Sequence, residues 1–319
     1  MPEGHSVHRI ANQFSRHFVG KRCEVSSPQG RFAAGAAQLD GKRMIAARAV
    51  AKQMFLEFEG DLFLRVHLGL YGAWDFAGDL STATALSADD DGEESLTSIG
   101  APRLARYRMA EQEKVEDPIE SFPPDPVGQV RVRILTEDTV ADLRGPTACV
   151  VETPAEVQQA LDKLGPDPIN DDGPEAEKTF VDNVRKRNVA IGQLLMDQSV
   201  VAGIGNIYRA ELLFRQRIDP YKPGKKITVK QAKALWADWS KLLHDGVRDG
   251  LMLTMDGLSE AELKKAKRSR KDRHWVYHRE GEPCRVCGTE IRMADMAGRK
   301  LYWCPKDQKS QVKFTPRGG

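Results

Sequence analysis

The chain has 319 residues, 40% of them hydrophobic, so it can bury a sizeable core and two domains are expected. Its 48 basic and 46 acidic residues give a formal net charge of +2. No apolar run reaches the ~18 residues of a membrane span, and the start, Met-Pro-Glu-Gly-His, lacks the apolar segment of a secretory signal. Five cysteines, three of them clustered near the C-terminus, argue against a disulfide framework and favour a reducing, cytoplasmic setting with a metal site.

The first half of the chain predicts a short helix followed by β-strands. Apolar residues recur on one helical face over residues 4–17. Alternating apolar residues on either side of Glu59-Gly60-Asp61 predict a hairpin with one buried face. The strand pattern resumes over residues 129–136, and the run that begins at Cys149 ends the sheet. A sandwich or a small barrel is the economical way to bury such strands.

An acidic segment interrupts these strands at about residues 77–126. It holds twelve acidic and four basic residues, a net charge of −8, and it is rich in Ala, Ser, Asp and Pro. Such a composition buries little, so we expect much of it to be a mobile insertion, with Arg103–Met109 as a short ordered patch.

The second half of the chain predicts helices. Thr153-Pro154-Ala155-Glu156 begins one that ends at Gly165, and Gly165–Pro174 is a linker. Thr228 and Gln231 form a capping box at the start of a long amphipathic helix. Residues 263–280 are basic and irregular. Residues 178–319 hold thirty bases and sixteen acids, a net charge of +14, which indicates either a polyanion partner such as nucleic acid or a solvated basic surface.

The N-terminus offers a nucleophile. Removal of the initiator Met would leave Pro2 with a free secondary amine, and a terminal amine has a pKa near 8. Its attack on a carbonyl-like carbon gives an iminium, which acts as an electron sink for elimination. Glu3 stands beside it, suited to acid/base work. An ordinary unstructured terminus is the alternative.

Residues 191–214 predict two helical runs around Ser199–Gly205. Gly203 and Gly205 allow the backbone to approach a ligand closely, and the amides at the start of the second helix favour an anion. Asn206 adds side-chain donors there, so we expect a phosphate site. The alternative is an ordinary helical hairpin with glycines used for packing.

Residues 281–319 form a cysteine-bearing module. Cys284 and Cys287, followed by Cys304 and Asp307, have the spacing of a zinc ribbon in which aspartate replaces the fourth cysteine. Residues 291–302 predict a hairpin with Gly298-Arg299 at its turn, where an arginine can contact phosphate. A purely structural knuckle, or one without metal, is the alternative.

The Pro2-Glu3 start, the helical motif at residues 191–214 and the cysteine-bearing module, in this order, resemble the formamidopyrimidine-DNA glycosylase and endonuclease VIII family of base-excision repair enzymes. The resemblance covers nearly the whole chain apart from the acidic segment, and the run Val66–Gly72 is closer to actinobacterial endonuclease VIII-like members. It implies an α+β fold with four parts. These are an N-terminal catalytic helix and β-sandwich domain (1–164), a linker (165–174), a helix–two-turn–helix domain (175–280) and a zinc-finger-like hairpin module (281–319).

The resemblance also implies the roles of single residues. Pro2 would form a Schiff base with the deoxyribose C1′, Glu3 would move protons, and Lys52 would be the catalytic hairpin lysine, preceded here by Ala51 where glycine is usual. The residues implied to contact DNA are Gly205 and Asn206 in the helix–two-turn–helix motif, Arg299 in the zinc hairpin, Leu70 and Tyr71 as the wedge that fills the gap left by a flipped base, and Arg144 as a loop arginine. For Tyr71, core packing beside Trp74 is the alternative.

The implied activity is that of a bifunctional DNA glycosylase and AP lyase, acting on oxidised bases, chiefly pyrimidines, by β,δ-elimination. The implied partner is double-stranded DNA with damaged bases or abasic sites, bound between the domains by a nucleoid-associated monomer. The implied cofactor is one zinc ion. Two alternatives stay open: a catalytically idle lesion- or junction-binding protein on the same fold, and a zinc-ribbon nucleic-acid binder in which the N-terminus is irrelevant.

Overall fold

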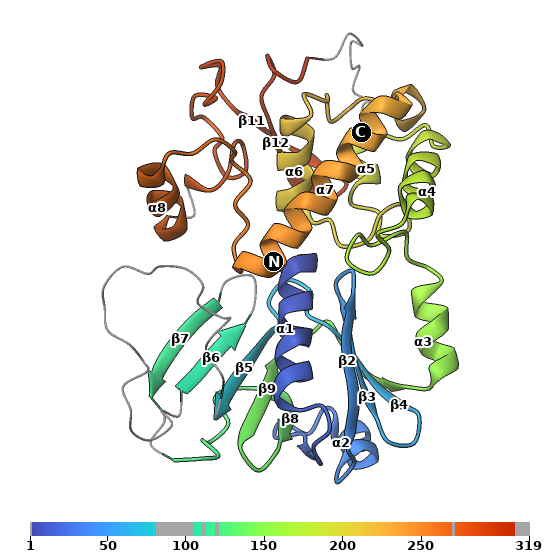
Figure 1. Cartoon of the computed structure of the whole chain (residues 1–319), viewed down its shortest axis with the longest axis vertical. Helices are drawn as coiled ribbons and strands as arrows, with labels where there is room; N and C mark the ends of the chain where they lie inside the picture. Colours follow the sequence, from blue (N-terminus) through green and yellow to red (C-terminus); the bar gives the residue numbers. More distant parts are fainter. Residues whose placement is uncertain are drawn as a thin grey trace. The chain divides into compact units, whose positions relative to one another are not determined.

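The computed structural model describes residues 2–78, 80, 105–109, 113–118, 121–269 and 272–309. Its contacts divide the chain into two compact units, Met1–Asp162 and Lys163–Gly319 (Figure 1). None of the described helices is long and apolar enough to cross a membrane.

The first unit is a helix packed on a β-sandwich. An antiparallel six-stranded sheet has the order β1-β8-β9-β5-β6-β7, and a four-stranded sheet has the order β10-β4-β3-β2. The elements are α1 (Gly4–His17), β1 (Glu24–Ser26), α2 (Ala33–Leu39), β2 (Met44–Val50), β3 (Gln53–Phe58), β4 (Leu62–His67), β5 (Ala73–Gly78), β6 (Ala105–Met109), β7 (Glu113–Pro118), β8 (Val130–Leu135), β9 (Thr139–Arg144), β10 (Ala148–Glu152) and α3 (Pro154–Leu161).

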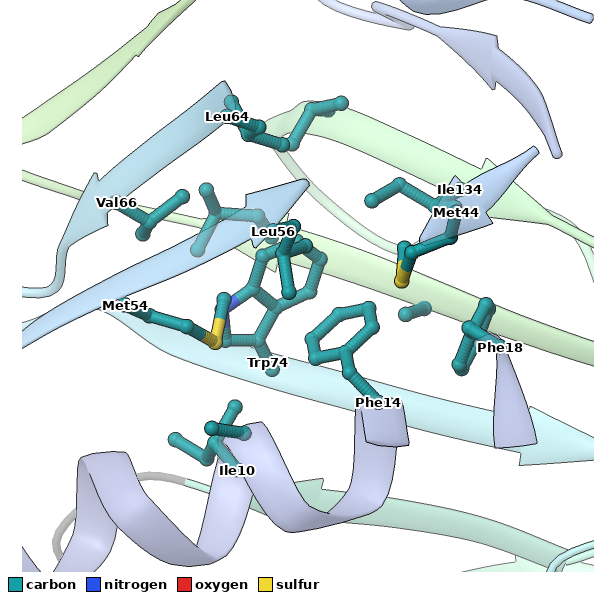
Figure 2. Packing of buried hydrophobic residues seen from close by; sticks show 14 of the residues in the cluster. Ile10, Phe14, Phe18, Met44, Met54, Leu56, Leu64, Val66, Trp74 and Ile134 are labelled. Carbon is teal, nitrogen blue, oxygen red and sulfur yellow. The ribbon is translucent and has the colours of Figure 1, made fainter. Parts of the chain in front are cut away.

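Apolar side chains of both sheets and of α1 form one core. The predicted face of α1 is buried, and Phe14 packs edge-on against Trp74 of β5, with 4.8 Å between ring centroids (Figure 2). Leu56 and Leu64 reach the same core from the four-stranded sheet. The apolar residues that alternate along these strands therefore point into the sandwich and the residues between them point outward, as strand geometry requires.

The acidic segment contributes two strands to this sandwich. β6 pairs with β5, β7 pairs with β6, and Met109 is buried in the core. The short ordered patch expected at Arg103–Met109 is therefore confirmed for residues 105–109, whereas the expectation of a segment without ordered structure is wrong for residues 113–118. Unpaired backbone groups at the edge of β5 accept a further strand whatever charges its outward side chains carry. Residues 81–104, where mobility was also expected, lie outside the described part of the chain.

The second unit is helical and ends in a hairpin. Its elements are α4 (Pro174–Arg185), α5 (Ile191–Leu194), α6 (Asn206–Arg215), a 3-10 turn η1 (Gly224–Lys226), α7 (Val229–Asp249), α8 (Glu260–Arg268), β11 (Arg292–Met296) and β12 (Arg299–Trp303). The capping box at Thr228 is confirmed at the start of α7. The expectation that residues 263–280 are irregular is wrong for the first of them, which belong to helix α8. A capping box formed by Ser259 and Glu262 starts this helix.

The cysteine-bearing hairpin packs directly on α6. Ala210 and Phe214 of α6 share a small core with Ile291 and Tyr302 of the hairpin module. The hairpin turn is Ala297-Gly298, both with positive φ, so that Arg299 is the first residue of β12 instead of a turn residue. The hairpin is thus held by the helix that begins at Asn206.

Candidate active site, phosphate-binding helix and metal site

Pro2 and Glu3 lie at the head of α1, and both are buried. Glu3 is the N-cap residue, and its carbonyl accepts a hydrogen bond from the Ser6 amide at 3.1 Å. Its carboxylate makes no capping bond. Because Phe14 packs in the sandwich core, α1 is anchored there, and the two candidate catalytic residues lie directly before its first turn.

His5, two residues beyond Glu3, was not singled out from the sequence. Burial lowers its pKa to about 3, and electrostatic interactions with Arg9 and His8 lower it further. The imidazole is therefore neutral at physiological pH, and its Nε2 lies 3.2 Å from the Ser6 hydroxyl. A histidine on a polar helix start carries no sequence signal for such a shift, because burial causes it.

Lys52 lies in the two-residue turn that joins β2 to β3, and it is half-buried. Ala51, the other turn residue, is buried with φ +59°, which is the conformation that glycine adopts most easily. α1 packs against β2 and β3, the two strands that flank the turn. Burial lowers the pKa of His67, and the nearby positive charge of Lys52 lowers it further.

Leu70 and Tyr71 form the turn between β4 and β5, where they are 44% and 85% exposed. Trp74 is fully buried in the core below. The alternative that Tyr71 packs in the core beside Trp74 is therefore wrong. A tight turn, closed by the Gly72 amide bonding to the Leu68 carbonyl at 3.0 Å, presents two apolar side chains to solvent.

Arg144 ends strand β9 and does not lie in a loop, as the sequence had suggested. Its Nη2 lies 2.6 Å from Asp75 on the neighbouring strand β5. The guanidinium therefore has an intramolecular partner that balances its charge.

Asn206 is the first residue of α6, and Gly205 is its N-cap. Gly203, with φ +90°, turns the chain into the helix, and its amide is held by Gln198 at 3.0 Å. The Asn206 amide nitrogen donates to the Lys300 carbonyl of β12 at 2.8 Å. Arg299 precedes Lys300 in β12 and is exposed. The two predicted phosphate contacts of this unit, Asn206 and Arg299, therefore lie on two elements, α6 and β12, that this hydrogen bond connects.

The four predicted metal ligands converge. The donor atoms of Cys284, Cys287, Cys304 and Asp307 all lie within 4.8 Å of one another. A tetrahedral zinc site with Zn–S bonds of about 2.3 Å places its sulfurs about 3.8 Å apart, so the cluster has the dimensions for a single zinc ion with one carboxylate ligand. Arg217 Nη1 lies 3.4 Å from the Asp307 carboxylate.

Comparisons with known proteins agree along the chain. The formamidopyrimidine-DNA glycosylase N-terminal domain matches residues 1–114, its H2TH domain matches 164–256, and the zinc finger found in FPG and IleRS matches 281–309. Endonuclease 8 1 of Mycobacterium tuberculosis is 38% identical over 305 residues, which cover 96% of this chain and 98% of the relative. A formamidopyrimidine-DNA glycosylase of Prochlorococcus marinus is 36% identical over about half of each chain, 49% and 53%.

A crystal structure of the Lactococcus lactis Fpg bound to a FAPY-dG-containing DNA superposes with a TM-score of 0.69 and 20% identity, covering 96% of this chain and 99% of that one, and it bears on the fold alone. The domain matches and the full-length relative together show that this chain belongs to the formamidopyrimidine-DNA glycosylase and endonuclease VIII family.

Proposed function

We propose that this protein excises oxidised bases, chiefly pyrimidines, from double-stranded DNA through a Schiff base on Pro2, followed by β- and δ-elimination. Membership of the family makes it a DNA glycosylase with AP-lyase activity in base excision repair. The proposal adds the residues and the order of events.

The observation that carries the proposal is the burial of Glu3 beside Pro2 at the head of an anchored helix. In the chemistry we propose, the Pro2 nitrogen forms a bond to C1′ while the bond from C1′ to the base breaks, and the base leaves with a proton. The sugar ring then opens: the bond from C1′ to O4′ breaks, O4′ takes a proton, and the Pro2 nitrogen becomes part of an iminium. The iminium acidifies the hydrogens on C2′, so loss of one proton expels the 3′ phosphate, and a second elimination expels the 5′ phosphate. Glu3 is the group placed to give and take protons.

Two other features support binding to damaged duplex DNA. The solvent-exposed Leu70 and Tyr71 can fill the gap that an extruded base leaves, since extrusion costs a few kcal/mol of stacking. Asn206 and Arg299 supply donors for phosphate, in a region whose net charge is +14.

Borohydride trapping on abasic DNA tests the nucleophile. We expect a covalent adduct with protein that begins at Pro2, and none with protein that retains Met1, as verified by mass spectrometry. Glu3→Gln serves as the matched variant: it should excise bases roughly 10²–10⁴-fold more slowly while binding DNA normally. Trapping by protein that retains Met1 would refute the role of Pro2, and an idle lesion binder would trap with neither form.

A further inference from the structure

Arg209 lies on α6 one turn after Asn206, and it is fully buried. A buried arginine has a high desolvation cost, so its guanidinium is expected to serve a specific set of acceptors. Its sequence position carries no signal of this burial, because an arginine in a helix is ordinarily a surface residue.

The guanidinium of Arg209 joins three elements of the proposed phosphate site. Its Nη2 donates to the Oδ1 atom of Asn206 and, at 2.9 Å, to the carbonyl of Lys300. Asn206 Nδ2 donates to the same Lys300 carbonyl at 2.8 Å. The Asn206 side chain, the start of α6 and the strand that begins at Arg299 are thereby linked in one hydrogen-bonded group.

This arrangement determines which way the Asn206 amide faces. Arginine has donors only, so the atom that faces Arg209 must be the oxygen. The carbonyl of Lys300 only accepts, so the amide atom that faces it must be the nitrogen. A phosphate oxygen also only accepts, and an amide turned by 180° would present the wrong atom to it.

We propose that Arg209 is a positioning residue that fixes the orientation of the Asn206 amide, so that its nitrogen uses one hydrogen for the Lys300 carbonyl and offers the second to a DNA phosphate. This inference rests on the proposed function, in which Asn206 and Arg299 contact phosphate. Arg209 itself touches Asn206 and the backbone, and it acts on DNA through them.

A double-mutant cycle tests the proposal, with affinity measured on a duplex that contains a tetrahydrofuran abasic analogue at several salt concentrations. Asn206→Ala should weaken binding roughly 10-fold or more, the value of one hydrogen bond to a charged group. Arg209→Gln should weaken it by a similar factor, and the double variant should be hardly weaker than either single one. Arg299→Ala should lower the salt slope by about one, while Arg209→Gln should leave the slope unchanged.

Arg279→Gln is the matched control. Arg279 is also buried in this unit and donates to backbone carbonyls, those of Trp275 and Pro283. Its loss should lower the unfolding temperature, and its effect on affinity should be independent of Asn206. Arg209→Lys, which keeps the charge and donates only, should restore part of the affinity lost in Arg209→Gln.

The possible failures are distinguishable. Normal affinity of Asn206→Ala would remove Asn206 from the proposed function. Weak binding by Asn206→Ala together with normal binding by Arg209→Gln, or additive losses in the double variant, would overturn the role of Arg209. If the Arg209 variants do not fold, NMR decides: separate, slowly exchanging Nη resonances of Arg209 should change in Asn206→Ala, and identical resonances in the two proteins would overturn the proposal.

Discussion

At the scale of single residues, the turn that carries Lys52 depends on an alanine in an unfavourable conformation. Ala51 has φ +59° and is buried, so a larger side chain meets both backbone strain and crowding. Ala51→Gly should leave the free energy of unfolding within about 1 kcal/mol of the parent, whereas Ala51→Val should lower it by roughly 2 kcal/mol or more.

Urea unfolding measures both changes. Ala47→Val, at a half-buried position inside strand β2, is the matched control and should be tolerated, because valine suits an extended strand. An Ala51→Val protein as stable as the Ala47→Val protein would show that the turn relaxes without cost.

His5 makes stability depend on pH. Its pKa is about 3 in the folded protein against 6.5 in the unfolded chain, so between these values the unfolded chain binds a proton that the folded chain does not. The free energy of unfolding therefore falls as the pH drops below 6.5, by up to about 1.4 kcal/mol for each pH unit from this residue. His5→Gln should lose less stability than the parent between pH 6.5 and 4.5.

Urea midpoints at a series of pH values test this expectation. His244→Gln, which changes an exposed histidine of α7, should keep the parent's pH dependence. The same slope in His5→Gln and in the parent would mean that His5 is protonated in the folded state.

At the scale of elements, α6 contacts the metal-binding hairpin module at several points and begins at the proposed phosphate contact, Asn206. Asn206, the first residue of α6, donates a hydrogen bond to the Lys300 carbonyl of β12. In the loop that follows α6, the Ile218 carbonyl accepts a hydrogen bond from Gln308, next to Asp307, at 3.0 Å. Phe214 on the same helix packs against the hairpin module. The hairpin is therefore held along the whole helix, which explains how a ribbon with an unusual ligand set keeps its place.

The carboxylate ligand should make zinc easier to remove. Oxygen is a harder ligand than thiolate, so Asp307→Cys should retain zinc longer against a chelator, measured as the rate of metal release to a colorimetric dye. Asp295→Cys, which places a cysteine on the exposed part of β11, should not change that rate. Equal release from Asp307→Cys and the parent would show that Asp307 does not occupy the ligand position.

At the scale of the whole molecule, excess negative charge and excess positive charge lie in different segments of the sequence. The acidic segment at residues 77–126 carries −8, whereas residues 178–319 carry +14. Polyanion binding should therefore be weakened by the acidic segment through long-range repulsion.

Replacement of Asp89, Asp90 and Asp91 by asparagine raises the net charge from +2 to about +5. We expect several-fold tighter binding to undamaged DNA at low ionic strength, and no difference near 0.5 M salt, where screening is strong. Unchanged affinity at low salt would show that these charges do not act on the DNA site.

The sequence alone was sufficient for features that depend on near neighbours. The Pro2-Glu3 start, the capping box at Thr228, the alternation around Gly60 and the spacing of the cysteines are all local patterns, and each has a physical meaning before the chain folds. For that reason the α+β class, the family and the convergence of the metal ligands could be predicted.

Tertiary structure decided what depends on distant residues. The addition of β6 and β7 to the sandwich, the pairing of Arg144 with Asp75 and the exposure of Tyr71 follow from how packed elements meet. Arg209 bonds to Lys300, 91 positions away, and no local pattern marks it. Burial and hydrogen bonding of such side chains are properties of the packed backbone, because only packing brings their partners within 3 Å and removes water from both.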